Sequence, residues 1–184
     1  DGRIELVCGA FSSDPARSRE SGRELYLVPE KRCYGSYAEM FDADVVSVGG
    51  TKNGLMGAEA VVFRNPALAE QAKWVRKATT QLISKHRYLA AQFIAMLSDD
   101  LWRRNAENAN AMARRLAAGL ADAGVHITQP VEVNAVFATM TDPQVLQEQF
   151  HFYPWEGPDE VRLMCSWDTT AAAVDAFVAA VRGA

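Results

Sequence analysis

The sequence predicts an α/β fold in which a glycine-rich pair of strands is followed by a small carboxy-terminal α/β layer domain. Two β-branched runs, Asp44–Val48 and Ala58–Phe63, flank a Gly-rich turn, a pattern typical of buried strands. From Pro66 onward the apolar residues recur with a helical period. After Gly124, predicted strands and helices alternate, which favours a layered α/β arrangement.

Two long amphipathic helices are predicted in the middle of the chain, because apolar residues recur every four positions. Ser98 is placed to cap the second of them. The apolar positions of the first are Leu89, Phe93, Leu97 and Leu101, and those of the second are Met112, Leu116 and Leu120.

We place residues 1–85 in part of a larger domain and residues 86–184 in the small carboxy-terminal domain.

The carboxy-terminal third contains two predicted strands, at residues 131–140 and 161–166. Asp142 and Pro143 form the start of a helix between them, since Pro is favoured at the first helical position. A last helix is predicted over residues 170–181. Residues 12–32, by contrast, are dense in Ser, Arg, Glu and Pro and are interpreted as loop.

Composition limits the class of protein. The 184 residues are 49% apolar and 23% charged, as in ordinary globular chains. The 19 basic residues are scattered and the net charge is −4, so no nucleic-acid surface is predicted. No apolar run is long enough for a membrane span, and residues 1–5 lack the basic and then apolar pattern of a secretory signal. The chain does not begin with Met, so it was either processed or is a piece of something longer.

The three cysteines, Cys8, Cys33 and Cys165, lie far apart and lack CxxC spacing. No disulfide framework or metal site is therefore predicted, and a reducing cytoplasm fits best.

Lys52 is the strongest candidate for chemistry. It follows a predicted buried strand in VVSVGGTKNGLMGAEAVVF, where glycines flank it on both sides. A lysine amine forms imines with aldehydes when it is unprotonated. Glycines would let a flat ring and a phosphate approach the main chain, and Thr51 could give a hydroxyl to the phosphate. From the residues alone, a solvated turn lysine is the more frequent outcome.

The segment DVVSVGGTKNGLMGAEAVVF closely resembles the cofactor-lysine segment of low-specificity threonine aldolases, which depend on pyridoxal phosphate (PLP) and have the aminotransferase-like fold type I. The resemblance continues through Lys73–Gln92, Asp99–Leu120 and the pattern HFYPWEGPDEVRLMCSWDTT at His151–Thr170. It covers roughly residues 36 to 184 and implies the end of a PLP-binding large domain followed by the small domain.

The resemblance also implies residue roles. Lys52 matches the lysine that binds PLP. Arg162 matches an arginine that clamps the substrate carboxylate, although from the residues alone an ion pair at the rim is an equal alternative. Lys77 matches a basic residue near the family's active site, although a solvated helix lysine is an equal alternative. The opening Asp1-Gly2-Arg3 resembles a shortened Asp-Gly-Ala-Arg motif. In that motif the aspartate pairs with the pyridinium nitrogen and the arginine helps to bind carboxylate.

As a member of this family, the protein would cleave threonine or allo-threonine, a β-hydroxy-α-amino acid, to glycine and acetaldehyde. It would act as a homo-oligomer, a dimer or a tetramer. The family's ring-stacking histidine and phosphate-binding Gly and Thr belong to an earlier part of its sequence, so we expect no turnover by these 184 residues alone. Two alternatives remain: another PLP lyase or transaminase of fold type I, and an inactive relative serving as a structural or partner-binding module.

Overall fold

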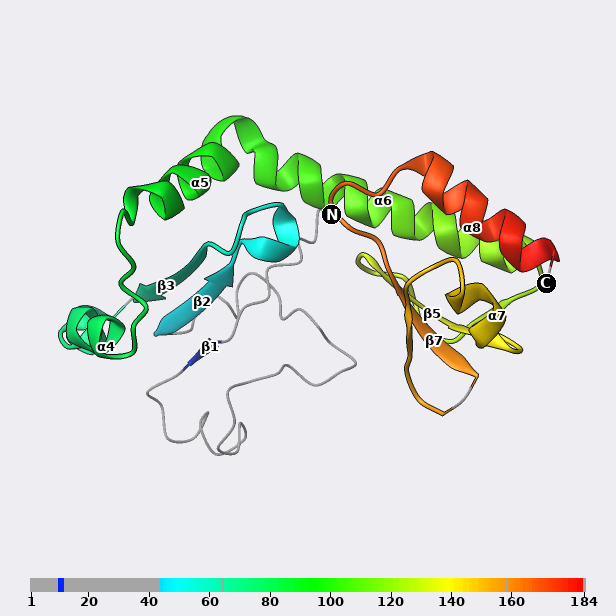
Figure 1. The fold of residues 1–184 in the computed structure, drawn as a ribbon, viewed down its shortest axis with the longest axis horizontal. Coiled ribbons are helices and arrows are strands. Elements are labelled where there is room, and N and C mark those ends of the chain that lie inside the picture. Colours follow the sequence, from blue (N-terminus) through cyan, green and yellow to red (C-terminus); the bar gives the residue numbers. More distant parts are fainter. Residues whose placement is uncertain (1–9, 12–43, 64, 158, 184) are drawn as a thin grey trace. The chain divides into compact units, whose positions relative to one another are not determined.

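A computed structural model describes residues 10–11, 44–63, 65–157 and 159–183 of the 184-residue chain (Figure 1). These residues fall into two compact units, one ending at Asp99 and the other beginning at Asp100. The predicted domain boundary after residue 85 stays a prediction. None of the described helices is both long and apolar enough to cross a membrane.

The unit that ends at Asp99 contains an antiparallel sheet in the order β1-β2-β3. Its strands are β1 (Ala10–Phe11), β2 (Val45–Gly49) and β3 (Glu59–Phe63). The β2 and β3 strands are the predicted pair on either side of the glycine-rich turn. Val45 and Val46 of β2 are buried, as expected for a β-branched run. Gly49 of β2 lies directly opposite Glu59 of β3.

Three helices follow in this unit: α3 (Pro66–Ala69), α4 (Ala72–Ala78) and α5 (Arg87–Leu97). Asn65 caps α3, because its side-chain oxygen accepts a hydrogen bond from the backbone N–H of Ala67 at 3.1 Å.

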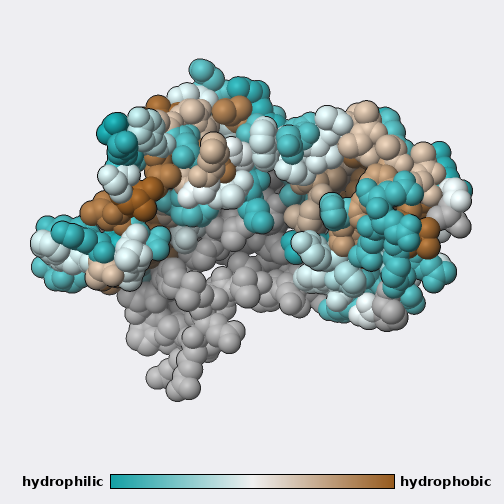
Figure 2. Space-filling view, viewed as in Figure 1, coloured by the Kyte–Doolittle hydropathy of each residue, from teal (hydrophilic) through white to brown (hydrophobic). Residues whose placement is uncertain are grey.

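Figure 2 shows apolar surface over the unit that carries β3, α4 and α5. More than half of the Trp74, Tyr88 and Ile94 side-chain surface is exposed.

The predicted cap at Ser98 is wrong. The Ser98 hydroxyl donates to the carbonyl of Ile94 at 2.7 Å, so the residue ends α5 instead of starting the next helix. Asp99 and Asp100 then take positive φ angles of 50° and 55°, which interrupt the helical backbone. The next helix, α6, begins at Leu101 and continues to Asp122.

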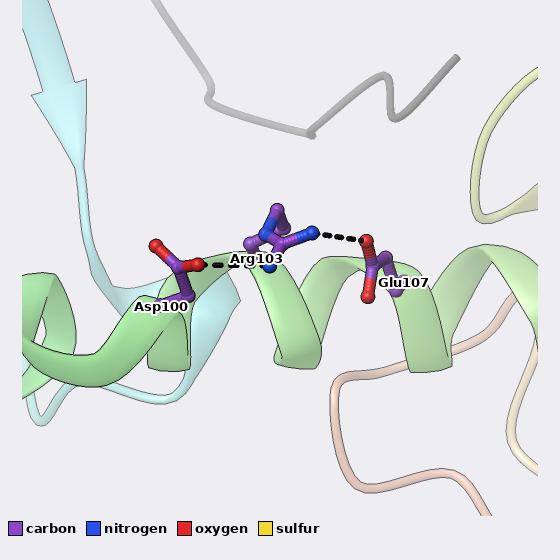
Figure 3. Close-up of polar contacts among 3 residues, drawn as sticks. All are labelled: Asp100, Arg103 and Glu107. Carbon is purple, nitrogen blue, oxygen red and sulfur yellow. Dashed lines mark hydrogen bonds and ion pairs between the residues drawn. The ribbon is translucent and has the colours of Figure 1, made fainter.

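The start of α6 carries a charged triplet (Figure 3). The guanidinium of Arg103 lies 2.8 Å from Asp100 and 3.4 Å from Glu107, at the spacings i−3 and i+4 that place side chains on one helix face. All three side chains are about half exposed, so the triplet contributes little to the stability of the fold.

The unit that begins at Asp100 contains a second antiparallel sheet, in the order β4-β5-β7-β6. Its strands are β4 (His126–Ile127), β5 (Ala135–Thr139), β6 (Tyr153–Pro154) and β7 (Glu160–Met164). The strand predicted to start at residue 131 starts at Ala135. Before it, the Asn134 side chain donates to the carbonyl of Cys165 at 2.8 Å, which ties the strand's entry to the end of β7.

Two helices lie side by side on one face of this sheet, α6 and α8 (Ala171–Gly183), and a short helix, α7 (Pro143–Gln147), follows β5 (Figure 1). Pro143 occupies the first position of α7, as predicted. The core lies between helices and sheet, and its buried residues include Leu120, Val136, Val161 and Phe177. The β-sheet residues that alternate with them, among them Phe137 and Arg162, therefore lie on the opposite face.

Candidate active site

The turn that carries Lys52 is held by backbone hydrogen bonds that converge on Gly50. Its N–H donates to the carbonyl of Ala58 at 3.0 Å, and its own carbonyl accepts from Asn53 at 3.0 Å and from Leu55 at 3.1 Å. Residues Thr51–Asn53 form a single turn of 3-10 helix, η1, between β2 and β3. Because both ends of the turn are hydrogen-bonded to Gly50, the backbone at Lys52 is held in one conformation.

Two glycines in this turn leave room for the chain's own atoms. A Cβ on Gly50 would lie 2.3 Å from Cδ1 of Leu55 and 2.8 Å from the carbonyl oxygen of Ala58. A Cβ on Gly49 would lie 2.7 Å from a carboxylate oxygen of Glu59. The space above both glycines is thus filled from within the chain. This differs from the expectation that they admit a ring or a phosphate.

Gly57 is different, because a Cβ there would meet nothing within 4 Å. Its φ of 78° lies in the left-handed region that favours glycine. The main chain of the turn is therefore accessible at Gly57.

Lys52 itself is exposed and makes no hydrogen bond or ion pair within the part of the chain that the structure describes. Its neighbour Thr51 is engaged, since Oγ1 of Thr51 donates to Oε1 of Glu59 at 2.8 Å. A hydroxyl has one proton, so Thr51 could donate to a phosphate only after exchanging this bond, next to a carboxylate that would repel the phosphate. The phosphate contact stays a prediction.

Lys77 lies on α4 in the same unit as Lys52 and is exposed. Both alternatives, a residue near the active site and a solvated helix lysine, agree with its exposed position. Asp1 and Arg3, together with residues 4–9, 12–43 and the cysteines Cys8 and Cys33, lie outside the described residues.

Arg162 lies on β7 in the other unit and is half-buried. It stands opposite Phe137 of β5 and Tyr153 of β6, on the sheet face away from the helices. Its guanidinium carbon is 5.3 Å from the ring centre of Trp155. Within the described residues it has no carboxylate partner, and its Nε is shielded from solvent without a hydrogen bond. An uncompensated cation in this position is suited to binding an anion.

The sequence alone assigned no role to Glu59 and Trp155, which are neighbours of the candidate residues. The sequence between Trp155 and Glu160 contains Gly157-Pro158-Asp159, a turn signal that would have indicated a hairpin. In such a hairpin, residues equally far from the turn face each other, and this would have placed Tyr153 beside Arg162 and Trp155 nearby.

The residues present fit a cofactor aldehyde at Lys52, because the amine is unpaired, accessible and carried on a fixed backbone turn. They also fit a carboxylate at Arg162. The two residues belong to different compact units. A buried thiol at Cys165 is not part of either group, and burial raises the pKa of that thiol to about 11.

The family model for beta-eliminating lyases matches residues 13–143 of the chain. The fold and the site define an α/β chain that carries a lysine on a fixed turn between two strands. Because the family model covers most of its length, the chain belongs to the beta-eliminating lyase family. This match begins at residue 13, whereas the likeness to threonine aldolases predicted from the sequence begins near residue 36.

Threonine aldolases are among its relatives. The low specificity L-threonine aldolase of Pseudomonas aeruginosa is 44% identical over 130 residues, which are 68% of this chain and 38% of that protein. The enzyme of the same name from a Pseudomonas species is 41% identical over 143 residues, 76% of this chain and 41% of that protein. The predicted resemblance to this group is confirmed. The chain spans about two fifths of the length of these relatives.

A solved structure of Leishmania major threonine aldolase matches the fold with a TM-score of 0.71 and 28% sequence identity. The match covers 77% of this chain and 43% of that one. The predicted α/β fold class is therefore confirmed.

Proposed function

We propose that the native protein containing this chain is a PLP-dependent aldehyde-lyase. It cleaves threonine or allo-threonine to glycine and acetaldehyde. The observation that carries the proposal is Lys52: an unpaired amine on a fixed turn, in a chain 44% identical to a threonine aldolase over 130 residues. When bound, PLP supplies an electron-withdrawing ring that stabilises the carbanion left by breaking the Cα–Cβ bond.

In this proposal Lys52 holds the cofactor covalently through Nζ. The fixed η1 turn limits the directions in which the side chain can point, which supports an orientation suited to reaction. Thr51 and Lys77 are proposed as further cofactor contacts. Asp1 is proposed as the partner of the pyridinium nitrogen, with Arg3 as an additional carboxylate ligand.

Arg162 binds the substrate carboxylate in this proposal. Its free guanidinium is supported by an aromatic ring and is not neutralised by a described carboxylate. Carboxylate binding at this arginine would place the amino acid in one orientation, so that only one of its bonds faces the cofactor ring. We further propose a homo-oligomer, a dimer or a tetramer, located in the cytoplasm.

The test is product analysis with the native protein, PLP and threonine. We expect equimolar glycine and acetaldehyde, and none above background from the Lys52→Ala variant. A keto acid formed together with consumption of an amino-group acceptor would indicate a transaminase instead. No product from any β-hydroxy-α-amino acid would favour the structural or partner-binding module.

The Arg162→Ala variant tests the second site. Removing a charge-assisted bidentate contact costs about 1.5–3 kcal/mol, or roughly tenfold to more than a hundredfold in affinity. We expect this loss for the amino acid and almost none for PLP. Equal losses of both affinities would mean that Arg162 has a structural role.

A further inference from the structure

The guanidinium of Arg162 is open at one end and enclosed at the other. Its Nε is shielded from solvent and has no hydrogen-bond partner in the described structure. The terminal nitrogens Nη1 and Nη2 have no described partner either, but they are not among the shielded atoms. An anion can therefore approach the terminal edge of the fork, with two parallel N–H groups facing it.

Trp155 lies against this guanidinium because of the hairpin that joins β6 to β7. Tyr153 stands opposite Arg162, and the N–H of Trp155 donates to the carbonyl of Glu160 at 2.7 Å. These pairings bring the Trp155 ring to 5.3 Å from the guanidinium carbon.

The Trp155 ring has a second aromatic contact. Phe137 of β5 contacts Trp155 edge to face, with ring centres 5.2 Å apart and an angle of 62° between the rings. Phe137 in turn stands opposite Arg162 in the β5–β7 register. On this sheet face the Trp155 ring thus contacts both the Arg162 guanidinium and the Phe137 ring.

We infer that Trp155 is a positioning residue for carboxylate binding: its ring holds the Arg162 guanidinium so that the Nη edge faces the incoming substrate. The inference rests on the proposed function. An arginine side chain has several rotatable bonds, and ordering it when a ligand binds reduces affinity. A ring that already orients the planar fork removes part of that cost.

The proposed role predicts an effect on ligands with a carboxylate and none on ligands without one. The experiment measures dissociation constants of the PLP-loaded native protein for glycine and for methylamine, which lacks the carboxylate. The Trp155→Leu variant should bind glycine about tenfold more weakly and methylamine unchanged. Trp155→Phe, which keeps a flat ring, should stay within about threefold of the unmodified protein for glycine.

Trp167→Leu is the matched control, because Trp167 lies in the same unit and is 40% exposed but has no contact with Arg162 among the described interactions. It should leave both dissociation constants unchanged. If Trp155→Leu does not fold, Phe137→Leu replaces it. Loosening the ring from one side should weaken glycine binding alone, by a few-fold.

Two results would overturn the inference. One is a Trp155→Leu variant that binds glycine normally although Arg162→Ala does not, which would leave the proposed function intact. The other is an equal loss of glycine and methylamine affinity, which would show that Trp155 only supports the fold. Normal glycine binding by Arg162→Ala would contradict the proposed carboxylate site itself.

Discussion

The hydroxyl of Thr128, just after β4, donates a hydrogen bond across the sheet to the carboxylate of Glu160 on β7. Glu160 is two residues from Arg162 on the same strand, so the two side chains lie on the same face. The bond draws the carboxylate toward β4. Glu160 is thus a carboxylate on the same strand and face as Arg162, and its hydrogen bond is with Thr128.

Replacing Thr128 with Val should therefore free Glu160 to compete for Arg162 and weaken binding of the amino acid by about threefold to tenfold. The double variant Thr128→Val with Glu160→Gln should bind almost normally, because the competing charge is gone. Calorimetric titration with glycine measures both. Equal weakening in the single and double variants would contradict this role.

Thr51 and Glu59 form the corresponding pair at the Lys52 turn, where Oγ1 and Oε1 are 2.8 Å apart. Thr51→Val and Glu59→Ala should each destabilise the chain slightly, and the double variant should be destabilised by less than the sum of the two. We expect a coupling energy of about 0.5–1 kcal/mol from denaturant unfolding, because the bond is exposed. Glu59→Gln keeps an acceptor and is the control. A coupling energy near zero would show that the bond does not hold the turn.

Gly119 of α6 allows α8 to approach closely. A Cβ at this position would lie 2.8 Å from Cγ2 of Val178. Gly119→Ala gains about 1 kcal/mol of helix propensity but overpacks a buried contact at a cost of about 1–3 kcal/mol, so a net destabilisation of about 1 kcal/mol is expected. Gly183→Ala, where nothing lies within 4 Å, is the control and should not destabilise the chain. Adding Val178→Ala to Gly119→Ala should relieve the clash. If the two losses of stability simply add in the double variant, the clash with Val178 is disproved.

Arg115 of α6 and Asp175 of α8 form a two-bond ion pair with both distances at 2.8 Å. The guanidinium lowers the pKa of Asp175 below its ordinary value of 3.8. A lowered carboxyl pKa adds stability above the ordinary value and loses it as the pH falls through the lowered pKa. The unmodified chain should thus have a higher Tm than Asp175→Asn at pH 7, with the difference shrinking below about pH 3.8. A difference that is independent of pH would contradict the pairing.

The sequence predicted the parts of the fold that depend on local pattern. The β-branched run before Gly49 and the glycine turn at Lys52 are local signals, and the strand pair follows from them. The helix break after Leu97 was missed because Leu97 and Leu101 continue the apolar period across it. The break is a backbone feature of Asp99 and Asp100, whose short polar side chains tolerate positive φ, and periodicity does not report it.

Long-range pairing limited the prediction of the site. The β4 and β6 strands have two residues each, too few for any period, and exist because β5 and β7 pair with them. The contact between Trp155 and Arg162 depends on that register, so the motif in the sequence singled out the arginine as a candidate but not its aromatic neighbour. Lys52 was singled out by its glycines, and its proposed role came from the resemblance to threonine aldolases.

Covalent attachment of PLP to Lys52 is the central claim, and reductive trapping tests it most directly. The native protein is incubated with PLP, reduced with borohydride and digested, and the modified lysine is located by mass spectrometry. We predict one dominant adduct on Lys52, absent from the Lys52→Ala variant, because its amine is accessible and has no described ion-pair partner. A dominant adduct on Lys77 or Lys85, with Lys52 unmodified, would contradict the account.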